Sequence, residues 1–387
     1  MKLAIHGGTP EVTAPMARYD SVGNEGMSSA EEACWSDRPL SGYLGGIDRG
    51  GYYVSKLEDE WAAKFGAKHA IACNSATSGL MAAAFAVGLG KGDRFAVSPY
   101  TMSATVAAPM FTGAEPVFCD VEVDTFCLDP DLWSNHRAIS ECRAVVITNL
   151  FGHPSRAMDM APNLSAKCAL IEDNSQSPLA MDHDYYAGTF GDVGVFSLNV
   201  HKHLNCGEGG ICVTDDAGIA KRLRQFINHG EMDSGTIGLN LRMTEISAAI
   251  ALDQLRRADE LIDGRVNQAS EIVQAIGDIP GLMEPYTREL CRHVFYAIPY
   301  LLLDQEKYTR FQFVEALRAE GVPLAEGYVQ PLYHLPAFAK YKRDCSVAED
   351  LYSNQLFYFE NCAYSPTPEQ VKQIGNAFQK VAEELSV

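Results

Sequence analysis

The sequence has few basic residues for its length. Lys and Arg number 31 against 50 Asp and Glu, so the 387-residue chain carries a formal net charge of −19 at pH 7. Proteins bind nucleic acids through Lys and Arg that neutralise phosphates, and anionic membranes attract polybasic segments. The charge therefore excludes both as expected partners. A small anion can still bind where backbone amides and a few side chains form a local site.

Long apolar runs and paired cysteines are also missing. The N-terminus has one lysine and only three consecutive apolar residues, Leu3–Ile5, too few for a signal peptide. No apolar run approaches the roughly 20 residues that span a bilayer. The eleven cysteines include no CxxC pair and no Cys/His cluster with zinc spacing. We therefore expect a cytoplasmic protein with free thiols, no metal site and no membrane partner.

Two nucleotide-binding motifs are absent. The sequence contains no GxxxxGK[ST] motif, which excludes a P-loop protein. The glycines at 88, 90 and 92 lack the third glycine of GxGxxG and precede a predicted strand instead of following one. A dinucleotide-binding site of the NAD type is therefore not expected.

Short apolar runs alternate with helix-like stretches between residues 67 and 214. The runs are apolar on both faces, which is typical of strands in a mostly parallel sheet covered by helices. This alternation predicts an α/β fold. The predicted strands are His69–Cys73, Arg94–Ser98, Pro116–Val121, Ala144–Asn149, Cys168–Asp173, Val193–Leu198 and Gly210–Thr214, and the predicted helices are Thr77–Leu89, Ser103–Phe111 and Asp215–Ile227.

The pattern changes in the last third of the chain. An amphipathic helix is predicted at Met243–Leu261, with a second segment from Asp263 to Ile276. The following elements predict a smaller α+β domain. We place the boundary near residue 250, so that residues 1–250 form an N-terminal arm and a large domain and residues 251–387 form a small domain. The predicted later elements are Val294–Leu303, Lys307–Glu320 and Glu369–Leu385.

Small polar residues follow the first predicted strand. Asn74, Ser75, Thr77 and Ser78 come between Cys73 and an alanine-rich helix. Small polar residues at such a position cap a helix and leave backbone N–H groups for an anion. The same residues would also serve as an ordinary N-cap.

Two further residues stand at sites typical of catalysis. Asp173 ends a predicted strand, where open α/β sheets place their ligands. A carboxylate there needs a cation or several donors, and a structural cap is the alternative. Lys202 lies between a strand and the flexible run Gly207–Gly210. Taken alone, it would be an ordinary surface lysine.

The order of these features predicts an enzyme that uses pyridoxal 5'-phosphate. The phosphate of this cofactor binds at a helix N-terminus, and its pyridine nitrogen pairs with a carboxylate. Its aldehyde forms a Schiff-base linkage with a lysine amine. The helix start after Cys73, the strand-end Asp173 and then Lys202 supply these groups in that order along the chain.

Three ordered motifs resemble the DegT/DnrJ/EryC1/StrS family of pyridoxal-phosphate-dependent aminotransferases. They are Phe196-Ser197 through Lys202 to Gly207-Glu208-Gly-Gly210, Glu172-Asp173-Asn174-Ser175-Gln176, and Asn240-Leu-Arg-Met-Thr-Glu245. The similarity extends from Leu40 to about His334. It implies the type I, aspartate aminotransferase-like fold, with a mostly parallel sheet in the large domain.

The resemblance also implies individual roles. Lys202 would bind the cofactor covalently, and Asp173 would pair with the pyridinium. Gln176 would contact the 3-oxygen of the ring. Asn240 would reach the phosphate in a neighbouring subunit, which implies a homodimer with shared active sites; a helix cap is the alternative for Asn240. The phosphate ligands in the same chain would be Ser197, Thr77 and the amide of Ala76.

The sequence departs from the family pattern at a few positions. Met102 stands where the family usually places an aromatic residue over the ring, and Tyr100 lies two residues earlier. His201 and His203 flank the lysine, and we expect them to pack or to contact the substrate edge. The segment Tyr328–His334 would line the entrance or pack in the core.

A lysine at 202 favours amino transfer, because a related dehydratase branch has histidine there. We expect L-glutamate to be the donor, pyridoxamine phosphate the intermediate form of the cofactor, and a nucleotide-linked keto-sugar the acceptor at C3 or C4. Such a product would belong to surface-glycan or natural-product sugar biosynthesis. The alternatives are a free keto-cyclitol, because Gly7–Pro10 resembles openings of that branch, and a non-catalytic regulator.

Overall fold

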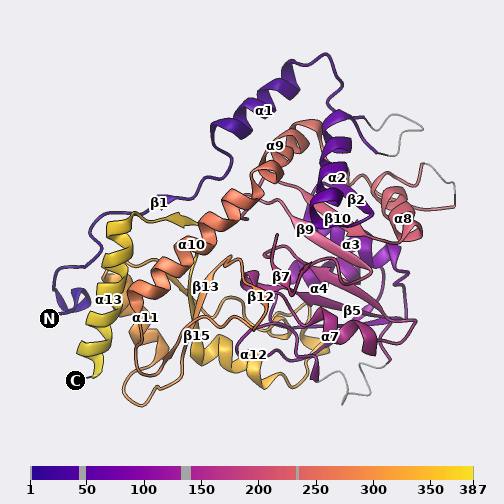
Figure 1. The fold of residues 1–387 in the computed structure, drawn as a ribbon. Helices are drawn as coiled ribbons and strands as arrows, with labels where there is room; N and C mark the ends of the chain where they lie inside the picture. Colours follow the sequence, from indigo (N-terminus) through magenta and orange to yellow (C-terminus); the bar gives the residue numbers. More distant parts are fainter. Residues whose placement is uncertain (1, 43–48, 132–140, 232–234, 387) are drawn as a thin grey trace.

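The computed structural model describes residues 2–42, 49–131, 141–231 and 235–386, and a seven-stranded sheet forms its centre (Figure 1). The strand order is β2-β10-β9-β6-β5-β3-β4. The strands are β2 (His69–Cys73), β3 (Arg94–Val97), β4 (Glu115–Phe118), β5 (Ala144–Thr148), β6 (Ala169–Asp173), β9 (Val193–Ser197) and β10 (Gly210–Thr214).

Both faces of this sheet are buried. In β5, Ala144 and Val146 belong to one apolar cluster, while Val145 and Ile147 belong to another. This alternation follows from the two-residue period of a strand and explains why the strands read as continuous apolar runs. The covering helices include α2 (Tyr52–Phe65), α3 (Ala76–Ala86), α4 (Ser103–Met110), α7 (Ala157–Met160), α8 (Ala217–Ile227) and α9 (Glu245–Arg256).

The sheet is mostly parallel. Strands β4, β3, β5, β6 and β9 pair in parallel, whereas β10 is antiparallel to both β9 and β2. The predicted α/β fold is therefore confirmed. Because β5, β6 and β9 run in the same direction, Thr148, Asp173 and Ser197 lie at one edge of the sheet.

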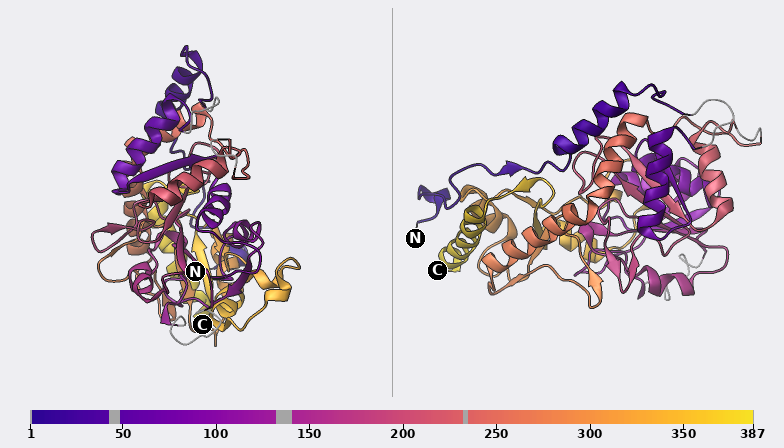
Figure 2. Two further views of the ribbon diagram at one scale, coloured as in Figure 1. Left: turned by 90° about the vertical axis from the view of Figure 1, so that its right-hand side faces the viewer. Right: turned by 45° about the horizontal axis from the view of Figure 1, so that its top comes forward.

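A second core forms beyond α9, at the end of the molecule where both termini lie (Figure 2). An antiparallel sheet of β11 (Leu282–Met283), β13 (Ile298–Leu302), β15 (Leu356–Phe359) and β14 (Leu324–Glu326) packs with α10 (Ala258–Ile276), α11 (Arg310–Ala319) and α13 (Pro368–Ser386). Leu3 and Val12 pack in the same core. We refer to residues 258–386 as the small unit; the predicted boundary near residue 250 stays a prediction.

The N-terminal segment runs along both cores. Strand β1 (Ala17–Arg18) pairs with β16 (Tyr364–Ser365), and α1 (Gly23–Trp35) then packs beside α9 (Figure 1). Three further short strands, β7 (Met181–Asp182), β8 (Tyr185–Tyr186) and β12 (Cys291–Arg292), form a separate small sheet, and α12 spans Ser346–Asp350. None of the helices within the described ranges is long and apolar enough to cross a membrane.

The long helix after residue 240 differs from its prediction. It begins at Glu245 instead of Met243, because the side chain of Thr244 accepts a hydrogen bond from the amide of Ser247 and caps it. The break between α9 and α10 falls at Arg257, six residues before the predicted Asp263. At that break Arg257 donates to the carbonyl of Ser21, at 2.9 Å. Helices α1 and α2 were not predicted.

Candidate active site

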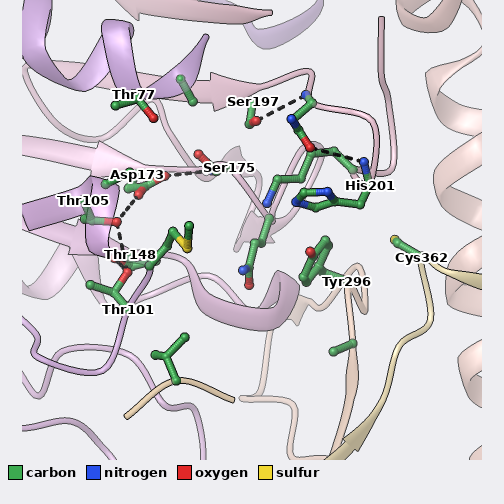
Figure 3. Close-up of a pocket in the computed structure, with 18 of the residues that line it drawn as sticks. Thr77, Thr101, Thr105, Thr148, Asp173, Ser175, Ser197, His201, Tyr296 and Cys362 are labelled. Carbon is green, nitrogen blue, oxygen red and sulfur yellow. Dashed lines mark hydrogen bonds between the residues drawn. The ribbon is translucent and has the colours of Figure 1, made fainter. Parts of the chain in front are cut away.

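A cavity lies between the carboxyl edge of the large sheet and the small unit (Figure 3). Of the residues predicted to bind the cofactor, all but Asn240 line it. The predicted lining residues are Ala76, Thr77, Met102, Asp173, Gln176, Ser197 and Lys202.

The start of α3 faces this cavity. The side chain of Ser75 accepts a hydrogen bond from the amide of Ser78 at 3.1 Å and caps the helix. The amides of Ala76 and Thr77 belong to the first turn of the helix, where N–H groups have no intrahelical acceptor, and no described residue accepts a hydrogen bond from either. Their N–H groups and the helix dipole form a site for a small anion. Ser197, at the end of β9, lines the cavity with them.

Gly210 allows the helix start to approach the sheet. In β10 this residue pairs with both Cys73 and Ser197. A Cβ atom at Gly210 would lie 2.6 Å from the carbonyl carbon of Ser75 and 2.7 Å from the amide nitrogen of Ala76. Any side chain would therefore displace the anion site. This explains the last glycine of the Gly207–Gly210 run.

Asp173 is held by two hydrogen bonds at the end of β6. Its Oδ2 accepts from the Thr105 hydroxyl at 2.6 Å, and its Oδ1 accepts from the amide of Ser175 at 3.1 Å (Figure 3). The carboxyl group is buried, since the residue is 4% exposed. An ionised carboxylate has further acceptor capacity on both oxygens, so Asp173 can still accept from a cationic N–H in the cavity.

A row of three threonine hydroxyls ends at this carboxylate. Thr101 lies 3.0 Å from Thr105 and 3.1 Å from Thr148, measured between hydroxyl oxygens (Figure 3). Because Thr105 donates its only hydroxyl proton to Asp173, it must accept from Thr101, which in turn accepts from Thr148. The donors therefore run in one direction toward the carboxylate. The sequence motifs did not predict these three residues.

Glu172, the residue before Asp173, faces away from the cavity and anchors the strand end. Its carboxylate accepts hydrogen bonds from the amides of Gly188, Phe190 and Gly191 at 2.8, 2.7 and 2.7 Å. Burial raises the pKa of this carboxyl, and the three amide donors act in the opposite direction. Glu172 thus fixes the backbone that carries Asp173.

Gln176 links the large sheet to the small unit. Its Oε1 accepts from the amide of Phe151 at 2.7 Å, and its Nε2 donates to the hydroxyl of Tyr328 at 2.9 Å. Tyr328 has a left-handed backbone, with φ 56°, after Gly327 at φ 63°. One Nε2 hydrogen of Gln176 remains for a ligand. The predicted contact with the ring 3-oxygen stays a prediction.

Lys202 is buried in the cavity wall. Its Nζ lies 4.6 Å from the centroid of the Tyr296 ring. Burial lowers the pKa of the Lys202 amine to about 8, against the attraction of Asp173 and Cys362. About a tenth of the amine is therefore unprotonated at pH 7, far more than for an exposed lysine. This makes Lys202 a suitable nucleophile and proton carrier.

The residues near the predicted ring face and the lysine separate into lining and packing residues. Met102 lines the cavity and is 57% exposed, whereas Tyr100 is fully buried and donates to the carbonyl of Gly327 at 2.8 Å. His201 lines the cavity. His203 is buried, with Nε2 2.8 Å from the carbonyl oxygen of Val294, and burial lowers its pKa to about 3.

Asn240 lies outside the cavity. It is exposed, and its backbone pairs with Asn228 in an isolated bridge. The alternative interpretation of Asn240 as the helix cap is wrong, because Thr244 caps α9. The predicted contact of Asn240 with a neighbouring subunit is not tested by a single chain and stays a prediction.

The small unit and the N-terminal segment supply residues that the motifs missed. In the segment Tyr328–His334, Tyr328 and Val329 line the cavity, whereas Leu332 and Tyr333 pack in the core. Both interpretations of this segment therefore apply, each to a part of it. No local pattern marks the others, because tertiary packing alone brings them to the site. They are Arg18, Tyr296, Tyr358, Glu360 and Cys362.

These features define a pyridoxal-phosphate-dependent aminotransferase of the type I fold. Within the described part of the chain, no group of three or more His, Cys, Asp or Glu residues could hold a metal ion. The model of the DegT/DnrJ/EryC1/StrS aminotransferase family matches residues 44–379, and the chain belongs to this family. The predicted family, enzyme class and cofactor are therefore confirmed.

The names of individual relatives state different sugars and cyclitols. GDP-perosamine synthase of Caulobacter vibrioides is 30% identical over 76% of this chain and 81% of its own. A putative L-glutamine:3-amino-2,3-dideoxy-scyllo-inosose aminotransferase of Micromonospora echinospora is 28% identical over 99% of this chain and 98% of its own. The crystal structure of DesI with its TDP-sugar product is 26% identical, with a TM-score of 0.81, over 98% of this chain and 96% of that one.

Proposed function

We propose that this enzyme transfers the amino group of L-glutamate to C3 or C4 of a nucleotide-linked keto-sugar. The product would enter the biosynthesis of a surface glycan or a natural product. The observation that carries the proposal is the cavity itself, where the amine of Lys202, the carboxylate of Asp173 and the start of α3 converge. Two relatives whose names state nucleotide-linked sugars support this acceptor class.

The donor set fits the cofactor. The amides of Ala76 and Thr77 and the hydroxyl of Ser197 would hold the phosphate, at the close approach that Gly210 permits. Asp173 would accept from the ring N–H, and Met102 can pack against the ring. Pyridoxal phosphate, when bound, carries the amino group between the substrates and delocalises the electrons released at the reacting carbon.

Lys202 moves the protons in this proposal. Its Nζ would take a proton from Cα of the donor and later deliver one to the keto carbon of the acceptor. A pKa of about 8 allows the amine to accept and to release protons near neutral pH. Tyr296, Tyr328 and Tyr358 line the cavity from the small unit, and the ring of Tyr296, 4.6 Å from Nζ, would limit the access of water on that side.

A free keto-cyclitol is the second candidate acceptor. It is favoured by the inosose aminotransferase, whose similarity covers nearly the whole of both chains. The name of that relative states L-glutamine as the donor, so L-glutamine is the second candidate donor. A non-catalytic regulator is disfavoured, because Lys202 is present and lines the same cavity as Asp173 and the start of α3.

We further propose a homodimer in which Asn240 completes the partner's site. Asn240 is exposed and outside the cavity of its own chain. Ile237 and Leu239 beside it are 89% and 45% exposed, and Trp35 at the end of α1 is 82% exposed. A second chain packed over this region would remove these apolar side chains from water. Light scattering should give the mass of a dimer, and Asn240→Ala should weaken cofactor binding while the protein stays dimeric.

A substrate screen tests the proposed function. The loaded enzyme is incubated with glutamate or glutamine and with UDP-, GDP- and dTDP-linked keto-sugars or free keto-cyclitols, and products are identified by mass spectrometry. We expect an aminated nucleotide sugar with glutamate as donor. Amination of cyclitols alone would favour the second candidate, and no amination of any acceptor by a cofactor-loaded enzyme would contradict both.

A further inference from the structure

Arg18 reaches the cavity through a strand pairing between the two ends of the chain. In the ribbon formed by β1 and β16, Arg18 lies opposite Tyr364, and the amide of Tyr19 donates to the carbonyl of Ala363 at 3.0 Å. Cys362 and Ala363, just before β16, line the same cavity as Lys202. The pairing therefore places Arg18 on the wall formed by these residues.

Two hydrogen bonds tie this segment to the lysine loop. The Tyr19 hydroxyl donates to the carbonyl of His203 at 3.1 Å, and the side chain of Asn205 donates to the Ser21 hydroxyl at 2.8 Å. His203 directly follows Lys202. The residue after Arg18, Tyr19, is therefore bonded to the residue after Lys202, His203. These bonds fix the backbone from which the exposed side chain of Arg18 extends.

The guanidinium of Arg18 is oriented without being neutralised. It stacks on the Tyr364 ring, 4.7 Å from the centroid, which leaves its N–H edge available. None of the described residues forms an ion pair or a hydrogen bond with it. The described lining residues contain two Lys or Arg side chains, Arg18 and Lys202, beside the carboxylates Asp173, Glu208 and Glu360.

We propose that Arg18 binds an oxyanion of a substrate, either the α-carboxylate of the amino donor or the diphosphate of the nucleotide sugar. A guanidinium binds both groups with paired, charge-assisted hydrogen bonds. The cofactor phosphate is not the ligand, because Thr77 at the start of α3 lies across the cavity from Cys362 (Figure 3). This proposal rests on the aminotransferase function proposed above.

The test uses the cofactor-loaded protein and two separate probes. The first is L-glutamate without acceptor, followed by the change in cofactor absorbance as a function of glutamate concentration. The second is calorimetric binding of UDP, GDP and dTDP. The variants are Arg18→Gln, Arg18→Lys and, as control, Arg256→Gln, which removes an exposed arginine that pairs with Glu60 outside the cavity.

For Arg18→Gln we expect the concentration that gives half-saturation with one probe to rise about ten-fold or more, because a charge-assisted bond pair is lost. Arg18→Lys should lose less, and Arg256→Gln should match the wild type. A higher half-saturating concentration for glutamate alone identifies the α-carboxylate as the ligand of Arg18, and a higher one for the nucleotides alone identifies the diphosphate. Higher values for both probes, at full cofactor content, identify one site that the two groups share.

Unchanged values with both probes would overturn the proposal, as would losses that merely follow a reduced cofactor content. A wild type that responds to neither probe would instead contradict the proposed function. The two failures are therefore distinguishable.

Discussion

Replacement of Thr105 by Val tests the threonine row that ends at Asp173. Valine keeps the shape of threonine and removes the hydroxyl that donates to Asp173 Oδ2 at 2.6 Å. A hydrogen bond to a charged group contributes about 1.5–3 kcal/mol, and 1.4 kcal/mol corresponds to a factor of ten. The variant also leaves the Thr101 hydroxyl, 3.0 Å away, without its acceptor. We expect affinity for pyridoxal phosphate to fall about 10- to 100-fold, because Asp173 loses the bond that orients it.

The assay is titration of the apoprotein with pyridoxal phosphate, followed by absorbance. Thr105→Ser keeps the hydroxyl and should stay close to wild type. Thr125→Val is the matched control, since Thr125 donates to the Glu122 carboxylate at 2.6 Å outside the cavity. It should lower the free energy of unfolding without changing cofactor affinity. Equal affinities of Thr105→Val and wild type, or an equal loss in Thr105→Ser, would refute the role of the row.

Three further outcomes follow from the same geometry. The rate of covalent cofactor attachment should rise with pH up to about 8 and then level off. The reason is that burial lowers the pKa of Lys202 to about 8 and only the unprotonated amine reacts. A flat stopped-flow profile between pH 6 and 9 would contradict this. Gly210→Ala should abolish cofactor binding while circular dichroism stays native, because its Cβ would lie 2.6 Å from Ser75; normal binding would refute the close approach. Glu172→Gln should lower the free energy of unfolding by about 1–3 kcal/mol in urea denaturation, because one buried amide loses its acceptor. An unchanged denaturation midpoint would show that the hydrogen bonds of Glu172 do not contribute to stability.

The parts of the fold that local pattern determines were predictable. Strands β2 and β10 have the predicted bounds, His69–Cys73 and Gly210–Thr214, because strands buried on both faces read as apolar runs between turn residues. The strand-end position of Asp173 followed from the same kind of run, whereas β9 ends at Ser197, one residue before the predicted Leu198. The roles of these residues required the family motifs in addition, since a strand end alone does not distinguish a cap from a ligand.

The rest depends on contacts between distant segments. The antiparallel direction of β10 is not encoded in its apolar run. Arg18 reaches the cavity through a partner far along the chain, Tyr364, and carries no motif of its own. The break at Arg257 depends on a bond to Ser21, which no helical period records. The proposed role of Asn240 would involve a second chain, which the pattern of a single sequence does not place.

The role of Lys202 is tested most directly by fixing the cofactor in place. Borohydride reduction of the protein loaded with pyridoxal phosphate, followed by peptide mass spectrometry, identifies the lysine to which it is attached. We predict a single modified peptide containing Lys202, whose attachment glutamate removes before reduction, and no modified peptide in Lys202→Ala. Modification of another lysine, or of none, would contradict the assignment of this cavity as the active site.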